Sequence, residues 1–166
     1  MARLIQIHLH QLSDLTCYQL SDRKTQVAER KSEVAFLRNQ LLSQSFELSV
    51  SDQQVVRTNF GKPYLKDYPD FSFNHSHSQN FYALATSRNV QNLGIDIEEL
   101  SRKVRFEALA QHAFHPEELK HWKTLAYDPE YWFKVWTIKE AVLKASGLGI
   151  RINLNELNTN IHPEQN

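Results

Sequence analysis

The sequence has little cysteine and little glycine, and each scarcity excludes classes of protein. Its 166 residues contain one cysteine, Cys17, which cannot form an internal disulfide framework or a multi-cysteine metal site. Four glycines disfavour glycine-dense β-sandwiches, phosphate loops and dinucleotide-binding folds. No apolar run approaches the roughly 18 residues of a membrane span, and the N-terminus lacks the pattern of a signal peptide. We therefore expect a cytoplasmic protein that makes no membrane contact.

Neither sign of charge is in excess. Lys and Arg together number 19, Asp and Glu together also number 19, and neither half of the chain forms a polybasic or acidic tail. Nucleic-acid binding through bulk charge is therefore not expected. With 41% apolar residues, a chain of this length buries roughly 70% of its unfolded surface, enough for one domain or a small two-lobed one.

The hydrophobic pattern of the first hundred residues predicts strands and one long helix. Within Arg3–His10, apolar Ile5, Ile7 and Leu9 alternate with polar residues, which is typical of a half-buried strand. Ser21 and Asp22 can cap a helix that follows. Its apolar residues at helical spacing are Val27, Val34, Leu37 and Leu41. Further strands are expected at Phe71–Asn74, Phe81–Thr86 and Leu93–Glu98.

After Ser101 the pattern becomes helical. Pro116 marks one helix start, and Asp128-Pro129-Glu130 marks a stronger one, with an acidic cap before proline at the first helical position. That helix is expected to end near Ser146, with Gly147 as a left-handed cap. Only Ile150–Leu154 suits a short strand beyond it. Strands followed by helices predict an α+β fold.

Asp96 and Glu98 form an acidic pair. Residues two apart on a strand share a face, so both carboxylates project together from a strand whose other face is apolar. Two like charges this close raise each other's pKa unless a cation neutralises them. Hard oxygen ligands at this spacing suit Mg²⁺, and the alternative is the solvated polar face of an edge strand.

A second polar set lies on the last long helix, at Trp136, Lys139, Glu140 and Lys144. Trp136, Glu140 and Lys144 recur every four residues and share one stripe. The adjacent stripe, expected to be buried, contains Val135, Ile138, Val142 and Ala145. A carboxylate between two lysines suits a metal ligand or general base beside phosphate-binding cations. The alternative is a surface ion pair of Glu140 with Lys144.

The third set is Asn74-His75-Ser76-His77-Ser78, between two expected strands. His75 and His77 share a face, as two transition-metal ligands would. The segment also suits a turn in which serine and asparagine side chains satisfy their own backbone. A third use is phosphate binding by imidazolium and hydroxyl groups. The residues alone leave these alternatives open.

Four motifs then occur in a fixed order along the chain. They are Gly61-Lys62-Pro63-Tyr64-Leu65, Phe73-Asn74-His75-Ser76-His77-Ser78, Gly94-Ile95-Asp96-Ile97-Glu98, and Trp136-Thr137-Ile138-Lys139-Glu140-Ala141 followed by Lys144 and Gly147-Leu148-Gly149. In these motifs the chain closely resembles the phosphopantetheinyl transferases of the surfactin-synthetase-activating type. The match covers about residues 30–150, and four motifs in order make it specific.

The resemblance implies an enzyme that transfers the 4'-phosphopantetheine arm of coenzyme A to a serine of an acyl or peptidyl carrier protein. Such holo-acyl-carrier-protein synthase activity releases adenosine 3',5'-bisphosphate, requires Mg²⁺, and serves fatty-acid, polyketide or nonribosomal peptide synthesis. By motif, Asp96, Glu98 and Glu140 resemble the metal ligands. Glu140, or a metal-bound water, would accept the serine proton, and Lys144 resembles the lysine at the reacting phosphates.

The remaining resemblances concern coenzyme A and the carrier. Lys62, Ser76 and His77 resemble contacts to the nucleotide end, particularly its 3'-phosphate, and Arg30 stands near the place of a coenzyme-binding arginine. Arg102, Lys103 and Arg105 follow the acidic pair, where they suit either docking of an acidic carrier or ordinary solvated surface.

The resemblance also implies a phosphopantetheinyl transferase-like fold, with an antiparallel sheet packed on a long helix. Residues 1–99 would form the half with the coenzyme A motifs, and residues 100–166 a shortened, mainly helical second half. In a shortened half we expect Trp132 and neighbouring apolar groups to be exposed, which predicts self-association or partner binding there.

Two rival functions stay open. One is a truncated homologue that binds coenzyme A or a carrier protein with little or no turnover. The other is a metal enzyme that uses His75 and His77.

Overall fold

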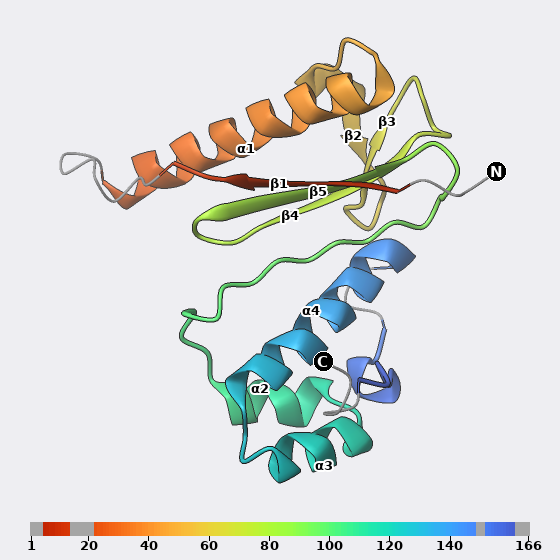
Figure 1. The fold of residues 1–166 in the computed structure, drawn as a ribbon. Helices are drawn as coiled ribbons and strands as arrows, with labels where there is room; N and C mark the ends of the chain where they lie inside the picture. The colour runs from red at the N-terminus through yellow and green to blue at the C-terminus, as the bar shows by residue number, and fades with distance from the viewer. Residues whose placement is uncertain (1–4, 14–21, 149–151, 162–166) are drawn as a thin grey trace.

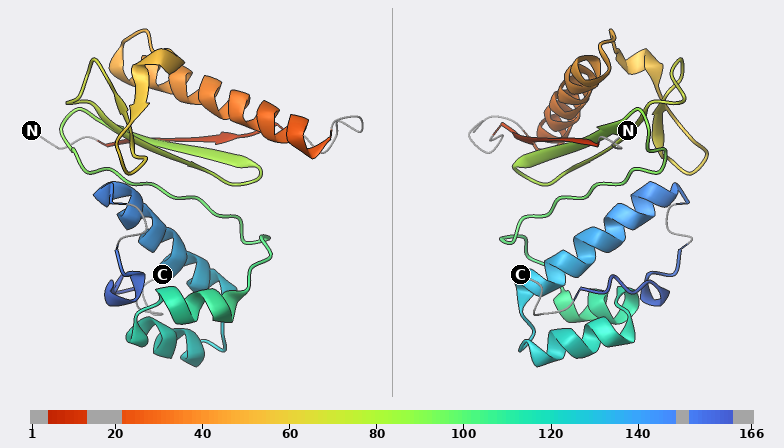
Figure 2. Two further views of the ribbon diagram at one scale, coloured as in Figure 1. Left: turned by 180° about the vertical axis from the view of Figure 1, so that it is seen from behind. Right: turned by 45° about the vertical axis from the view of Figure 1, so that its right-hand side comes forward.

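The computed structural model describes residues 5–13, 22–148 and 152–161, which form two lobes (Figure 1). In the first lobe one long helix lies on one face of a sheet, and the second lobe is helical. A long extended segment passes between the sheet and the last long helix, as all three ribbon views show (Figures 1 and 2). This arrangement is the expected α+β fold.

The sheet of the first lobe is antiparallel, in the order β1-β5-β4. Its strands are β1 (Gln6–Gln11), β4 (Ser72–His77) and β5 (Phe81–Ser87). Ala83 of β5 lies opposite Leu9 on one side and Ser76 on the other, which fixes the register. A second sheet pairs β2 (Val55–Arg57), which follows the 3-10 turn η2 (Asp52–Gln54), with β3 (Pro63–Leu65).

Helix α1 (Arg23–Phe46) covers the sheet with its apolar face. As expected, Asp22 caps it by accepting a hydrogen bond from the Thr25 backbone N–H at 2.9 Å, whereas Ser21 lies outside the described residues. Val34 and Leu41 are buried, but Val27 is 48% exposed, so the expected apolar stripe begins about two turns too early. The core under this helix contains Leu12, Val34, Leu41, Leu42, Phe46, Leu65, Phe73, Tyr82 and Leu84.

The apolar face of β1 was expected to be its buried face, and this expectation is wrong. Ile7 and Leu9 are 69% and 61% exposed, while His8 and His10 are half-buried. The reason is the position of α1, because His8 Nε2 lies 3.0 Å from Ser45 Oγ of that helix. Strand alternation indicates that two faces differ, but not which of them a helix will cover.

The second lobe contains α2 (Phe106–Ala113), α3 (Pro116–Thr124), α4 (Pro129–Ser146) and the short 3-10 turn η4 (Leu154–Glu156). The expected limits of α4 are confirmed: Asp128 accepts from the Tyr131 N–H at 2.8 Å, and Gly147 has a φ of 67°. The expected strand Ile150–Leu154 is wrong where it is described, since Leu154 begins η4, and Ile150 and Arg151 lie outside the described residues.

Trp132 was expected to be exposed but is fully buried at the centre of the second lobe. Its ring stacks on Trp136 and meets Phe106 edge-on, and its Nε1–H donates to the Phe106 carbonyl at 3.1 Å. The apolar α4 residues left in solvent are instead Ile138 and Val142, which are 39% and 37% exposed. Part of the stripe expected to be buried is therefore exposed, because the aromatic packing around Trp132 places a different face of α4 against the core of the second lobe.

Leu93–Glu98 was expected to be a strand, yet it forms no ladder within the described residues. The segment runs across one face of the sheet and follows β4 through side-chain bonds. Ser72 Oγ donates to the Gln91 carbonyl at 3.0 Å, and the Ile95 N–H donates to Asn74 Oδ1 at 3.0 Å. The face of a sheet offers side chains rather than free backbone groups, so an extended segment there cannot join the ladder.

None of the helices in the described ranges is long and apolar enough to span a membrane.

Gly94 lies where the extended segment passes α4. A Cβ added there would meet the Ala141 carbonyl oxygen at 1.9 Å and the Ala145 nitrogen at 2.6 Å. Both neighbours are helix backbone, which cannot rotate away. Only glycine therefore permits this approach.

We expect Gly94→Ala to lower the free energy of unfolding by at least about 3 kcal/mol, because the segment and α4 must separate. Gly61→Ala is the matched control, since Gly61 has a φ of 86° but open space around it. Backbone strain alone should cost this control about 1–2 kcal/mol. Urea unfolding of both variants provides the measurement, and equal losses would contradict the close contact.

Candidate functional site

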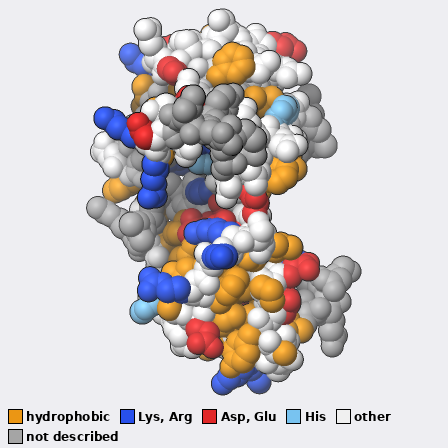
Figure 3. Space-filling model, turned by 90° about the vertical axis from the view of Figure 1, so that its left-hand side faces the viewer, with side chains coloured by type: hydrophobic (Ala, Val, Ile, Leu, Met, Phe, Trp, Pro, Cys, Tyr) orange, Lys and Arg blue, Asp and Glu red, His pale blue; other side chains and the backbone are white. Residues whose placement is uncertain are grey.

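Three elements meet between the lobes: β4, the extended segment 93–99 and the second half of α4. Alternation along β4 turns Asn74 and Ser76 toward the segment, whereas His75 faces the core beneath α1 and packs near Phe73 and Tyr82. Figure 3 shows a hollow between the lobes, with both acidic and basic side chains around it.

Ser76, Asp96 and Lys144 form a closed triangle of hydrogen bonds, with one side chain from each element. Lys144 Nζ donates to Asp96 Oδ1 at 2.6 Å and to Ser76 Oγ at 2.8 Å. Ser76 Oγ in turn donates to the same Asp96 oxygen at 2.8 Å. The structure thus brings together three of the residues selected from the sequence, across 68 positions of chain.

The other oxygen of Asp96 has no hydrogen-bond partner among the described residues. Oδ2 is buried, in a side chain that is only 7% exposed, and no described residue bonds to it. An unpaired buried carboxylate oxygen is costly, so such an atom points to a missing ligand. A divalent cation is a ligand of the right chemistry, because it is bound by oxygen atoms and compensates negative charge.

Glu140 and Glu98 lie around the same triangle. Burial raises the pKa of Glu140, and the charge of Asp96 raises it further, while Lys144 opposes them. Glu98 also raises this pKa, so the three carboxylates share one electrostatic site. Glu98 itself forms an ion pair with Arg102, a half-exposed side chain four residues later.

The three carboxylates are donors that suit Mg²⁺, and the unpaired Asp96 oxygen supports that match. In the parts of the chain that are described, however, no three His, Cys, Asp or Glu side chains lie in positions to hold a metal ion together. Asp96 and Glu98 are instead paired with Lys144 and Arg102. The Mg²⁺ site therefore stays a prediction, and so does a histidine-metal site.

Two cavities flank the triangle, and Lys144 lines both. The first, of about 480 Å³, is lined by Arg57, Phe60, Gly61, Lys62, Pro63, Asn74, His75, Glu140, Leu143, Lys144 and Gly147. The second, of about 760 Å³, is lined by Ser76, His77, Ser78, Gln79, Asp96, Ile97, Glu98, Glu99, Ser101, Arg102, Lys103 and Lys144. A long ligand could therefore extend past Lys144 from one cavity to the other.

The predicted coenzyme contacts are divided between these cavities. Lys62 lines the first, where its Nζ donates to the Ala145 carbonyl at 2.6 Å and burial lowers its pKa. Ser76 and His77 line the second. Arg30 lines neither, and its guanidinium bonds to Glu33 at 2.6 Å and to the Ser13 carbonyl at 2.7 Å.

Several residues of the first cavity were not selected from the sequence. Arg57 and Phe60 come from β2 and the loop after it, which carry no distinctive motif. A basic residue three positions before an aromatic one, shortly before Gly61-Lys62-Pro63, is the signal that could have found them. Lys139 was grouped with Glu140 and Lys144, but it points into the second lobe and lines neither cavity.

The known proteins to which this chain is similar agree with the resemblance of its motifs. A family model described as the 4'-phosphopantetheinyl transferase superfamily matches residues 92–166. The 4'-phosphopantetheinyl transferase Sfp of Bacillus subtilis is 30% identical over 128 residues, which cover 75% of this chain and 54% of the relative. The 4'-phosphopantetheinyl transferase HetI of Nostoc is 37% identical over 110 residues, 63% of this chain and 46% of the relative.

A mammalian protein is also similar. The mouse L-aminoadipate-semialdehyde dehydrogenase-phosphopantetheinyl transferase is 30% identical over 139 residues, 74% of this chain and 44% of the relative. The chain thus spans about half the length of the curated relatives it matches.

His75 generates a prediction about pH. Burial lowers its pKa from 6.5 to about 4, with help from the charges of Arg38 and Arg57. The unfolded chain then binds the proton more tightly than the folded one. The contribution that uncharged His75 makes to the free energy of unfolding is therefore complete above pH 6.5. It is lost as the pH falls toward 4, which lowers the free energy of unfolding by roughly 3 kcal/mol.

We expect His75→Leu to remove this component when the unfolding free energy is measured from pH 7 to pH 4. The comparison is the slope of wild type minus variant, because many carboxylates also titrate in that range. His112→Gln, on the exposed side of α2, is the control and should retain the wild-type slope. A His75→Leu profile parallel to wild type would show that His75 is protonated normally in the folded protein.

Proposed function

The chain belongs to the 4'-phosphopantetheinyl transferase superfamily, and we propose that it transfers the 4'-phosphopantetheine moiety of coenzyme A to a serine of an acyl or peptidyl carrier protein. The serine oxygen would form a bond to the phosphorus that carries the pantetheine. The bond from that phosphorus to the bridging oxygen would break, releasing adenosine 3',5'-bisphosphate. The observation that carries the proposal is the Ser76–Asp96–Lys144 triangle between two cavities, with one Asp96 oxygen unpaired.

Lys144 and Glu140 have complementary roles in this proposal. Lys144 borders both cavities, so its ammonium group can bind the pyrophosphate of a coenzyme that extends across them. Glu140 would accept the proton of the carrier serine. Burial and the neighbouring carboxylates raise its pKa in the metal-free protein, and a cation bound beside it would lower that pKa again.

A Mg²⁺ held by Asp96, Glu98 and Glu140 would offset the negative charge on the pyrophosphate oxygens. The unpaired Asp96 oxygen and the raised pKa of Glu140 both support a need for added positive charge at this point. Lys144 supplies part of that charge in the structure itself.

Of the three residues predicted to contact the nucleotide end of coenzyme A, we assign that contact to Lys62 in the first cavity, because Ser76 and His77 line the second cavity on the other side of Lys144. Lys62 is suited to the 3'-phosphate, because the lining of its cavity includes the further cation Arg57. Arg102 and Lys103, at the second cavity, would attract an acidic carrier protein, together with exposed Arg105.

A homologue that binds coenzyme A or a carrier with little turnover is the alternative. Intact-mass spectrometry of an apo carrier protein incubated with this protein, coenzyme A and Mg²⁺ separates the two. A gain of one phosphopantetheine unit supports the transferase. No gain, combined with coenzyme A binding by calorimetry, supports the binding homologue.

We expect Asp96→Ala and Glu140→Gln each to lower kcat/KM at least about 100-fold, because charge on the pyrophosphate would then be uncompensated in the transition state. Glu140→Gln should leave the apoprotein as stable or slightly more stable, since repulsion from Asp96 and Glu98 is removed. Glu130→Gln, at the exposed start of α4, is the control for both measurements. Folded variants that transfer at the wild-type rate would refute the roles of these carboxylates.

Lys62→Ala and His77→Ala should raise KM for coenzyme A roughly tenfold and change kcat less, the pattern of lost ground-state binding. With 3'-dephospho-coenzyme A the Lys62→Ala substitution should have little effect, because the phosphate that Lys62 contacts is missing, whereas His77→Ala should still raise KM. Exposed Lys66 provides the matched control, Lys66→Ala. For Lys62→Ala, an equal loss with both substrates would exclude contact with the 3'-phosphate.

A further inference from the structure

Lys139 and Glu140 are neighbours in the sequence, but they point to different parts of the protein. Glu140 lines the first cavity, whereas Lys139 is fully buried in the second lobe. The Lys139 ammonium donates to Glu118 Oε2 at 2.8 Å and to the Leu154 carbonyl at 2.9 Å. It also donates to the Leu157 carbonyl. These three bonds use all three of its hydrogens.

Glu118 is equally well satisfied and is only 1% exposed. Its Oε1 accepts from the Thr159 N–H at 2.8 Å and from Thr159 Oγ1 at 2.7 Å, and its Oε2 accepts from the His115 N–H at 2.8 Å. Burial alone would raise the pKa of Glu118, but the bonds from Lys139 and Thr159 outweigh it and hold the pKa below its usual value. The pair therefore stays ionised.

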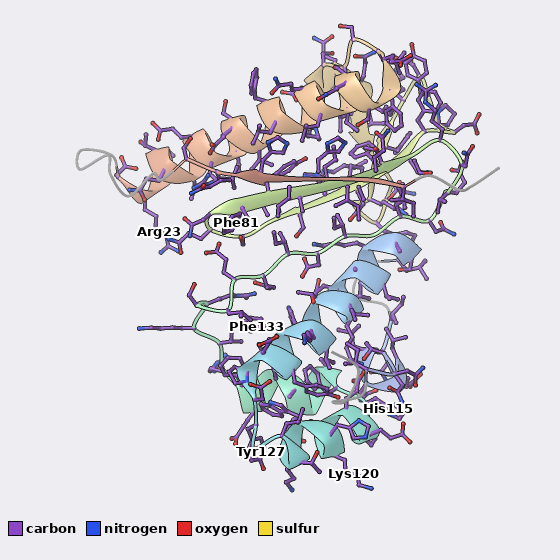
Figure 4. The ribbon with its side chains drawn as sticks, viewed as in Figure 1. Arg23, Phe81, His115, Lys120, Tyr127 and Phe133 are labelled. Atoms are coloured by element: carbon purple, nitrogen blue, oxygen red, sulfur yellow. The ribbon has the colours of Figure 1, made fainter. Side chains whose placement is uncertain are left out.

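The Lys139–Glu118 pair joins α3, α4 and the segment 154–159. His115, at the start of α3, lies on the second lobe away from the sheet, so the pair is anchored apart from the cavities (Figure 4). The buried residues of α4 are Tyr131, Trp132, Phe133, Val135 and Lys139. Lys139 is thus the last point at which α4 is anchored in its own lobe, one residue before Glu140.

The opposite side of α4 gives little support at this level. Ile138 and Val142 are more than a third exposed. Beyond Glu140 the helix is held by its contact with Gly94 and by the bond from Lys62 to the Ala145 carbonyl. Successive helical side chains differ in direction by about 100°, so the inward direction of Lys139 sets the direction of Glu140 and Lys144.

We propose that Lys139 and Glu118 are positioning residues, which fix the rotation of α4 so that Glu140 and Lys144 face Asp96. The inference rests on the proposed transferase function. Neither residue touches the coenzyme; each acts through the direction of α4. A displacement of about 1 Å at a reacting group can cost roughly 100-fold in rate, so a small rotation is sufficient to matter.

The test replaces both charges together, by Lys139→Met with Glu118→Leu. Removing one partner would leave a buried unpaired charge and strongly destabilise the protein, whereas apolar replacement of both is often tolerated. The matched control is Lys134→Met with Glu130→Leu, which removes the exposed ion pair of 3.3 Å on the same helix. Unfolding by heat establishes that both double variants are folded.

Two measurements then decide the question. We expect kcat for transfer to fall at least tenfold while KM for coenzyme A changes less than about threefold. We also expect the affinity for Mn²⁺, measured by electron paramagnetic resonance without substrate, to fall at least fivefold. The control pair should change neither quantity. A folded Lys139→Met/Glu118→Leu variant with wild-type kcat and Mn²⁺ affinity overturns the proposal.

Thr159→Val serves if the double variant does not fold, because it removes one bond to Glu118 and keeps the ion pair. It should lower kcat severalfold at unchanged KM, and an unchanged kcat overturns the proposal. Failure of the proposed function is a separate result: the wild-type protein then transfers nothing. In that case the Mn²⁺ affinities of the wild type and variants still test whether the pair positions Glu140.

Discussion

The backbone contact between Gly94 and α4 is the constraint on which the site depends. It brings the extended segment against the helix closely enough that a single added carbon would overlap the Ala141 carbonyl oxygen. Two residues later, Asp96 meets Ser76 above it and Lys144 from the helix. A hydrogen-bonded site keeps a precise geometry only if the elements that carry its side chains are held rigidly against each other. Here the backbone of the extended segment packs directly on the backbone of α4.

The site also concentrates charge where burial makes charge costly. Lys144 and Arg102 compensate Asp96 and Glu98, but Asp96 Oδ2 has no partner in the described part of the chain and Glu140 has a raised pKa. Structural ion pairs are usually complete, as the fully bonded Lys139–Glu118 pair shows. One molecule thus contains a complete buried pair and an incomplete cluster, and the incomplete one lines the cavities. Unsatisfied groups of this kind are typical of binding and catalytic sites.

Much of the fold could be predicted from the sequence. The Asp128-Pro129 start and Gly147 end of α4 follow from rules that involve only neighbouring residues, and both are confirmed. Leu93–Glu98 has the alternation of a strand, but it crosses the face of the sheet and is bonded by side chains. Alternation reports an extended backbone, whereas membership of a ladder depends on a neighbouring strand edge that the local sequence does not contain.

By itself, the sequence determined the main candidate residues of the site, but not the full lining of its cavities. The motifs that contain Ser76, Asp96, Glu140 and Lys144 have a characteristic order and spacing. The structure joins three of these residues directly, because Asp96 bonds both to Ser76 and to Lys144. Only the tertiary structure decided where the side chains of α4 point: Trp132 inward, Ile138 outward, and Lys139 to Glu118 rather than to a phosphate. The physical reason is that every residue of a helix has the same backbone geometry, so partners distant in sequence select which face is buried.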